Sequence, residues 1–259
     1  MTQVTVELLN DLARRAGAIT LEHFMTKLSV ETKADESPVT IADRRTEQFL
    51  RDEILRLFPA DGIVGEEFGV TEGSSGRKWI LDPIDGTKSF IHGVPFYGVM
   101  IGVEERGEMV AGTVYIPPLG EATTAVRGQG CWWNGRRACV SQVAALSDSL
   151  LLTTDVAHHA ASGRGASWQA LASRARLVRT WGDCYGYILV ATGRAEVMMD
   201  ATMSAWDAAA LMVIMEEAGG SFTDYAGERT VYGNCGIGTN GKVLAELLGV
   251  IAAAEGAKS

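Results

Sequence analysis

The sequence predicts an α+β fold in which antiparallel hairpins are mixed with helical crossovers. Its strands outnumber simple strand–helix alternations, which disfavours a Rossmann sheet or a barrel. The chain has 259 residues, and a hydrophobic fraction of 47% is enough for a sizeable core. We expect two closely packed halves, because the rhythm of the pattern changes near residue 150. They are an α+β half over residues 1–145 and an α/β half over residues 146–259.

The first elements are predicted from periodicity and from helix breakers. Asp43 falls in the first turn of the second helix, where a carboxylate suits the helix dipole. Of the adjacent acids Glu66 and Glu67, one is expected to point inward at the end of its strand and the other to meet solvent. The expected elements are a helix over 4–25, a polar hairpin over 28–37 ended by Pro38, a helix over 40–58, a strand over 63–67 and a loop over 70–77.

The central motif begins as an apolar strand and ends in two aspartates, a glycine and a threonine. The strand delivers Asp82 and Asp85 close enough to bind neighbouring divalent cations, with the Ile84 carbonyl as a further oxygen ligand. Gly86 allows a close backbone approach, and the amides of Gly86 and Thr87 would open a helix, where an anion is favoured. We therefore expect metal plus phosphate here. The alternative is an acidic turn capped by Asp85.

After this motif the pattern predicts antiparallel strands. Apolar runs at 97–103 and 109–115 bracket a polar turn, which indicates a central hairpin. A strand over 121–127 is followed by a tight hairpin around Asn134-Gly135. Trp132 and Trp133 beside that turn are expected to be packing residues rather than a binding platform.

The second half contains shorter elements and two conspicuous polar positions. His158 and His159 are expected in a solvated loop, because no third nitrogen ligand lies nearby. Asp183 would be a good helix N-cap. The expected strands are at 150–154, 176–180 and 195–199. The expected helices are 166–174, one that opens within 181–187 and continues through residue 191, one from Ser204 to Glu217, and one at 241–254.

Composition disfavours several kinds of partner. A net charge of −9 makes a nucleic-acid backbone or an anionic membrane an unfavourable partner, whereas it fits divalent cations or a cationic substrate. No apolar run reaches the roughly twenty residues of a membrane span, and the N-terminus lacks a signal peptide's basic-then-apolar order. The four cysteines show no paired metal spacing and no disulfide framework. We therefore expect reduced thiols in a cytoplasmic protein.

Four motifs in order along the chain resemble the inositol monophosphatase family of magnesium-dependent phosphomonoesterases. They are Lys33 with Thr40-Ile41-Ala42-Asp43, then Gly65-Glu66-Glu67, Asp82-Pro83-Ile84-Asp85-Gly86-Thr87, and Ser204-Ala205-Trp206-Asp207-Ala208-Ala209. The resemblance implies a layered αβαβα sandwich of the inositol monophosphatase and fructose-1,6-bisphosphatase type. It also implies an active site between the two halves and a homodimer.

The resemblance also implies roles for individual residues. Thr87 and Glu66 would orient and deprotonate the attacking water, and Asp43 would accept a hydrogen bond from Thr87. Lys33 would lie in a loop that closes over the metals. Hard oxygen ligands without histidine or cysteine favour Mg²⁺ over Zn²⁺. Two or three Mg²⁺ ions per site would be held by Glu66, Asp82, the Ile84 carbonyl, Asp85 and Asp207.

The expected substrate is a phosphate monoester. Residues outside the metal site would determine which alcohol it carries. The stretch from Trp181 to Tyr187 is similar to the histidinol-phosphate phosphatase branch of the family. Asp183 and Asp200, with Gly182 and the aromatic wall of Trp181, would suit a cationic alcohol. Inositol 1-phosphate is the alternative substrate, and an adenosine 3′-phosphate metabolite is a weaker one. A catalytically idle, metal-binding regulator is a further alternative, from a different class.

Overall fold

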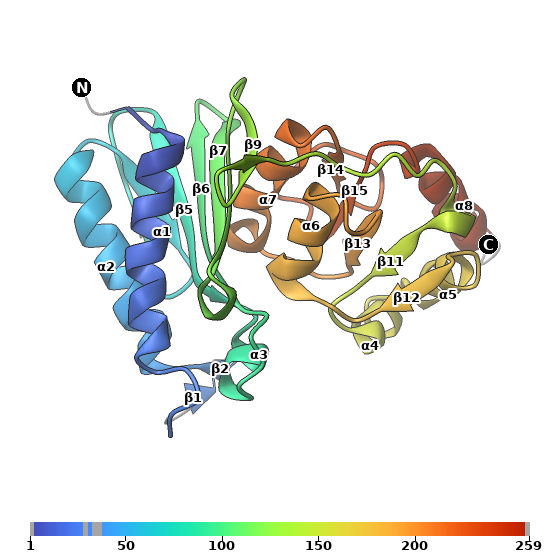
Figure 1. Ribbon diagram of the computed structural model, residues 1–259, viewed down its shortest axis with the longest axis horizontal. Helices are drawn as coiled ribbons and strands as arrows, with labels where there is room; N and C mark the ends of the chain where they lie inside the picture. The colour runs from blue at the N-terminus through green and yellow to red at the C-terminus, as the bar shows by residue number, and fades with distance from the viewer. Residues whose placement is uncertain (1–2, 28–30, 33–37, 257–259) are drawn as a thin grey trace.

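The computed structural model describes residues 3–27, 31–32 and 38–256, and there the chain forms five layers (Figure 1). The order is αβαβα, as the family resemblance implies. None of the described helices has the length and apolar character needed to cross a bilayer. From one side to the other, the layers are α1 (Val6–Leu21) with α2 (Ile41–Leu57), an eight-stranded sheet, α6 (Asp183–Ala191) with α7 (Ala205–Glu217), a five-stranded sheet, and α5 (Gly165–Ala172) with α8 (Leu244–Gly256) and the short α4 (Val156–Ala161).

The two N-terminal helices begin at side-chain caps. The Thr5 hydroxyl accepts the N–H of Leu8 at 3.2 Å, and Thr40 forms a capping box with Asp43 at the start of α2. The first helix ends at Leu21 rather than at the predicted residue 25. The chain turns there, and Met25 adopts a left-handed conformation with φ 58°.

The polar hairpin that follows α1 is described only in part. Strands β1 (Glu31–Thr32) and β2 (Pro38–Val39) pair antiparallel, with Glu31 opposite Val39. The prediction that Pro38 ends this hairpin is wrong, because Pro38 begins its second strand. Lys33 lies outside the described residues.

The larger sheet has the order β10-β9-β8-β7-β6-β5-β3-β4, in which only β3 and β5 run parallel. The predicted hairpins around residues 106 and 134 are confirmed. The loop prediction for residues 70–77 is wrong in part, because β4 pairs with β3 there. The strands are β3 (Gly62–Gly65), β4 (Gly69–Thr71), β5 (Arg77–Asp85), β6 (Gly98–Glu105), β7 (Glu108–Ile116), β8 (Glu121–Val126), β9 (Gly130–Trp133) and β10 (Arg136–Arg137), with α3 (Thr87–Ile91) between β5 and β6.

The smaller sheet has the order β12-β11-β13-β15-β14. The strand β11 runs parallel to both of its neighbours, and the other two pairs are antiparallel. Mixed pairing in both sheets agrees with the predicted mixture of hairpins and crossovers. Its strands are β11 (Leu150–Leu152), β12 (Leu177–Arg179), β13 (Val197–Asp200), β14 (Ser221–Thr223) and β15 (Gly236–Thr239).

The helix α7 lies between the two sheets and is buried along most of its length. It packs against β6 and β7 on one side and against β14 and β15 on the other. Close packing on the larger sheet requires glycine, since a Cβ at Gly102 would lie 2.6 Å from the Ala209 Cβ, and one at Gly112 would lie 2.4 Å from the Ala210 carbonyl oxygen. One hydrophobic core therefore joins strands of the first half to helices of the second.

Candidate active site

Three aspartates from two elements meet at the carboxyl end of β5. Asp82 and Asp85 lie at the end of that strand, and Asp207 lies in the first turn of α7. One carboxylate oxygen from each of the three lies within 4.8 Å of the others. The predicted delivery of acidic side chains to the end of this strand is therefore confirmed, and the strand brings them to a residue more than a hundred positions away.

Backbone amides hold these three side chains in place. Each carboxylate accepts one N–H: Asp82 from Ile84 at 3.0 Å, Asp85 from Cys184 at 2.5 Å, and Asp207 from Ser204 at 2.7 Å. The amide donors come from the central motif, from the first turn of α6 and from the N-cap of α7. Such bonds orient a carboxylate while leaving further oxygen lone pairs free.

The electrostatics of the cluster favour a cation. Burial, and then the charges of neighbouring carboxylates, raise the pKa of Asp82 and of Asp85 well above the usual value. Burial raises the pKa of Asp207 to about 6, with the charge of Glu66 adding to the effect. Three carboxylates this close repel one another, and a divalent cation bound among them would relieve that repulsion. An all-oxygen donor set fits a hard cation such as Mg²⁺.

Glu66 lies beside this cluster rather than within it. It directly follows β3, and its N–H donates to the Leu81 carbonyl at 3.2 Å, next to Asp82 on β5. Its charge raises the pKa of both Asp82 and Asp207. The carbonyl of Ile84, a predicted ligand, accepts the hydroxyl of Thr87 at 3.0 Å.

The predicted hydrogen bond from Thr87 to Asp43 is not formed in this structure. The Thr87 hydroxyl donates to Ile84 instead, while Asp43 accepts both the N–H and the hydroxyl of Thr40 at 2.7 Å. Asp43 is thus the capping carboxylate of α2. Burial raises its pKa to about 6, and the charge of Glu66 adds to that rise.

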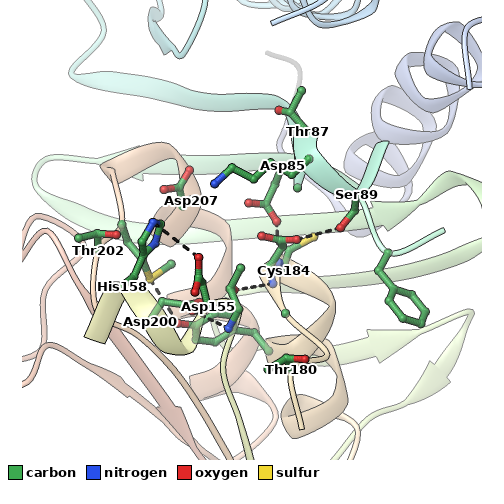
Figure 2. Close-up of a pocket in the computed structure, with 18 of the residues that line it drawn as sticks. Asp85, Thr87, Ser89, Asp155, His158, Thr180, Cys184, Asp200, Thr202 and Asp207 are labelled. Atoms are coloured by element: carbon green, nitrogen blue, oxygen red, sulfur yellow. Dashed lines mark hydrogen bonds and ion pairs between the residues drawn. The ribbon is translucent and has the colours of Figure 1, made fainter. Parts of the chain in front are cut away.

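A cavity of about 570 Å³ opens beside the aspartates. Asp85 and Asp207 line it, as do Gly86 and Thr87. Gly86 has φ 81° and precedes α3, so the predicted tight turn into a helix is confirmed. Figure 2 shows Asp85, Thr87 and Asp207 around one side of the cavity.

Another part of the cavity wall carries two more aspartates. Asp183 accepts the hydroxyl of Ser89 at 3.3 Å, and its own N–H donates to Thr154 Oγ1 at 2.8 Å. Asp200, at the end of β13, accepts the N–H of Thr154 at 3.0 Å. Burial raises the pKa of Asp183 to about 6 and that of Asp200 to about 7. A cation bound in the cavity would stabilise the ionised form of these carboxyl groups.

Two predictions for this wall are wrong. Asp183 is not the N-cap of α6, because Gly182 occupies that position and Asp183 is the first helical residue, with φ 52°. Trp181 is 39% exposed and does not line the cavity, although Gly182 does. The lining instead includes the aromatic residues Phe96 and Tyr187, and Phe96 stacks on Tyr185 with ring centroids 4.9 Å apart.

The prediction for the histidine pair is wrong except for the exposure of His158. Both residues lie on the helix α4, not in a loop. His159 is fully buried, where Thr153 and Tyr225 bind its two ring nitrogens and Trp168 stacks on its ring. His158 is exposed and lines the cavity.

The lining includes further residues that the sequence did not indicate as site residues, among them Ser89, Phe96, Asp155 and His158. His158 Nε2 lies 3.7 Å from a carboxylate oxygen of Asp155 (Figure 2). A signal existed for Asp155, because it follows a strand whose carboxyl end faces the crevice between the halves. Nothing in the local sequence pointed to Phe96.

The model of the inositol monophosphatase family matches residues 1–257. The chain belongs to the inositol monophosphatase family. Its family relatives include a histidinol-phosphatase of Chlorobaculum parvum, 47% identical over 227 residues that cover 87% of this chain and 88% of the relative. A histidinol-phosphatase of Mycobacterium tuberculosis is 37% identical, over 92% of this chain and 94% of that one.

A solved structure supports the same family and fold. The chain is similar to an IMPase of Thermotoga maritima with a TM-score of 0.88 and 30% sequence identity. The match covers 98% of this chain and 99% of that chain. Similarity over nearly the whole length means that both sheets and the helices between them are shared, not just the metal-site motifs.

Proposed function

We propose that this protein hydrolyses L-histidinol phosphate to L-histidinol and phosphate by direct attack of water. The observation that carries the substrate is the 47% identity to a histidinol-phosphatase over most of both chains. The aspartate cluster and the acidic cavity beside it support the chemistry. A phosphate monoester resists hydrolysis because its negative charge repels the nucleophile and its alkoxide is a poor leaving group.

The metal site would be built from Glu66, Asp82, the Ile84 carbonyl, Asp85 and Asp207, holding two or three Mg²⁺ ions. When bound, Mg²⁺ neutralises phosphate oxygens, lowers the pKa of a bound water and stabilises the leaving oxygen. The donor set supports this choice, because its side chains are all carboxylates and neither imidazole nor thiolate is among them.

The other residues of the site would position the phosphate and the water. The amides of Gly86 and Thr87 would hold the phosphate oxygens for in-line attack. The Thr87 hydroxyl would orient the water, and Glu66 would accept its proton. Asp43 is proposed to fix the Thr87 hydroxyl, by a hydrogen bond that is not formed in this structure. Lys33, which lies outside the described residues, is proposed to belong to a loop that closes over the metals.

The alcohol would be recognised by charge. L-Histidinol carries an ammonium and an imidazole, whereas inositol carries neutral hydroxyls. Asp183 and Asp200, which line the same cavity as Asp85 and Asp207, would pair with the cationic alcohol. Phe96 and Tyr187, rather than Trp181, supply aromatic surface in that cavity.

One comparison tests the substrate. On a single preparation, kcat/KM for histidinol phosphate should exceed kcat/KM for inositol 1-phosphate. The reverse order would make the chain an inositol-1-monophosphatase, the second candidate, which its family supports. Turnover of neither, with hydrolysis of an adenosine 3′-phosphate metabolite, would support the third candidate. If no monoester releases phosphate in the presence of magnesium, the remaining candidate is the catalytically idle, metal-binding regulator.

Two further parts of the proposal concern its setting. A homodimer is proposed from family analogy, and sedimentation analysis of the purified chain would test it. Cytoplasmic location is proposed because all four cysteines are free in the structure, which suits a reducing compartment.

A further inference from the structure

We propose that a buried ion pair on α2, Glu47 with Arg51, is a positioning device for Glu66. The pair holds the turn between β3 and β4, and thereby holds Glu66 against the aspartate cluster. This inference rests on the metal-binding role that the proposed function gives to Glu66. Neither Glu47 nor Arg51 lines the active-site cavity, so both act through the turn.

Glu47 binds the backbone directly after Glu66. Its side chain is fully buried, and its two carboxylate oxygens accept the N–H groups of Glu67 at 2.7 Å and Phe68 at 3.1 Å. Bonds from a charged acceptor to backbone amides are stronger than bonds between neutral groups. The two residues that follow Glu66 are therefore fixed to α2.

Arg51 binds the other end of the turn, where β4 begins. Its Nε donates to Glu47 at 2.7 Å, its Nη1 donates to Thr71 Oγ1 at 2.9 Å, and its Nη2 donates to the Gly69 carbonyl. The guanidinium also lies 5.9 Å from the centre of the Phe68 ring. One planar side chain thus joins the helix to both the turn and the start of β4.

Gly65 shows that the pair and the strand end fit closely. A Cβ at Gly65 would lie 2.0 Å from Glu47 Oε1 and 2.8 Å from Arg51 Nη2. Any larger residue would displace the ion pair from beneath the end of β3. The absence of a side chain at Gly65, directly before Glu66, therefore leaves room for the Glu47–Arg51 ion pair.

The other side of Glu66 is held by the sheet. Gly65 pairs with Leu81 in the parallel β3–β5 ladder, and the Glu66 N–H donates to the Leu81 carbonyl at 3.2 Å. Glu66 is thus held between a strand that carries Asp82 and a turn anchored on α2. An ion pair that holds a ligand's neighbours in this way restricts where the ligand carboxylate can go, which reduces the ordering required when a cation binds.

The test is Mg²⁺ binding by the full-length protein, freed of metal with a chelator and titrated by calorimetry. Glu47→Gln keeps the size of the side chain but loses its charge and one acceptor oxygen. We expect its Kd for Mg²⁺ to rise by about ten- to a hundred-fold. Thr71→Val removes a single bond to Arg51, and a smaller rise in the same direction is expected. The thermal unfolding of each metal-free variant is measured in parallel.

Glu53→Gln is the matched control. Glu53 lies on the same helix and pairs with Arg15 at 2.9 Å, but it joins α2 to α1 rather than to the turn. Its Kd for Mg²⁺ should equal that of the wild type. If Glu47→Gln binds Mg²⁺ as tightly as Glu53→Gln while only its stability falls, the ion pair merely supports the fold and the inference is wrong. Thr71→Val decides in the same way if Glu47→Gln does not fold.

Glu66→Gln separates this inference from the proposed function. A large loss of Mg²⁺ affinity in Glu66→Gln, with none in Glu47→Gln and Thr71→Val, overturns only the positioning role. Unchanged affinity in Glu66→Gln removes Glu66 from the metal site. In that case the proposed ligand set is wrong, and the positioning role of Glu47 and Arg51, which depends on it, is wrong as well.

Discussion

The backbone N–H of Cys184 donates to the carboxylate of Asp85 across 2.5 Å, although the two residues are 99 positions apart. This bond joins the first turn of α6 to the end of β5. It also places Asp183, the residue before Cys184, beside the metal-site motif, where a Cβ at Gly86 would lie 2.8 Å from its Oδ2. The residue proposed to select the alcohol and the residue proposed to bind metal are therefore set relative to each other by the backbone.

Asp85→Asn should remove magnesium-dependent turnover and yet stabilise the metal-free protein. Because the pKa of Asp85 is raised in the folded state, its ionised form disfavours folding near pH 7, and the neutral amide removes that penalty. Turnover should fall by more than about 100-fold, since loss of a ligand exceeds loss of an outer partner. Asp207→Asn should behave alike.

The measurements are phosphate release and thermal unfolding with and without Mg²⁺. Asp52→Asn, on the exposed face of α2, is the control and should change neither. Near-normal turnover of Asp85→Asn or Asp207→Asn at saturating Mg²⁺ would remove that residue from the proposed metal site.

Thr87→Ala should lower kcat and leave KM nearly unchanged, because the hydroxyl is proposed to orient water rather than to bind substrate. A fall of about 100-fold is expected, the lower end of what proton-transfer and orienting groups contribute. Thr87→Ser keeps the hydroxyl and should recover most of kcat. A rise in KM with kcat unchanged would instead make Thr87 a phosphate ligand alone.

Asp183→Asn should reduce kcat/KM for histidinol phosphate by roughly one to two orders of magnitude, since a charge-assisted hydrogen bond contributes about 1.5–3 kcal/mol. Asn is the suitable replacement, because it tolerates the positive φ of this position. Glycerol phosphate, whose alcohol is neutral, is the control substrate and should be hydrolysed nearly as before. Equal losses on both substrates would point to a damaged site, and no loss on either would exclude the charge pairing.

His159 should make the fold less stable in acid. Burial lowers its pKa from 6.5 to about 4, so the unfolded chain takes up a proton before the folded one does. Stability from this residue is complete above about pH 6.5 and is lost as the pH falls toward 4. Between pH 7.5 and 5 the loss from His159 alone should be about 2 kcal/mol.

Urea unfolding of the wild type and of His159→Gln at both pH values measures this loss as the difference in their pH dependence. His158→Gln, the exposed neighbour on α4, should show the wild-type pH dependence. Should His159→Gln lose as much stability in acid as the wild type, the buried imidazole is not the titrating group.

The parts of the fold that the sequence predicted well are those set by local pattern. Alternation and polar turns located β6 to β9, and the order of apolar and acidic residues in the central motif placed Asp82 and Asp85 at a strand end. The position of Asp207 beside them came only from the family resemblance. No local pattern connects a helix's first turn to a strand over a hundred residues earlier.

The failures have a common physical cause, which is partners distant in the chain. His159 was expected in solvent because no third nitrogen ligand lies near it in the sequence. The hydroxyl that binds its Nδ1 belongs to Tyr225, which lies 66 residues away. Asp183 was expected to cap α6, but its N–H is bound by Thr154 of another segment and its backbone takes a left-handed conformation. The strand β4 was predicted as a loop because the sequence around it is rich in glycine. Its contact with Arg51, which helps to hold it, lies with a residue distant in the chain.

The burial of α7 between the two sheets has a consequence for synthesis of the chain. All strands of the larger sheet have been synthesised once the ribosome has added Arg137. The helix that covers the sheet face with Met100 and Val114 begins only at Ala205. A nascent chain therefore carries an uncovered apolar sheet face while the intervening residues emerge from the ribosome. For the same reason, a fragment ending at residue 145 should aggregate when made alone and become soluble when residues 146–259 are supplied with it.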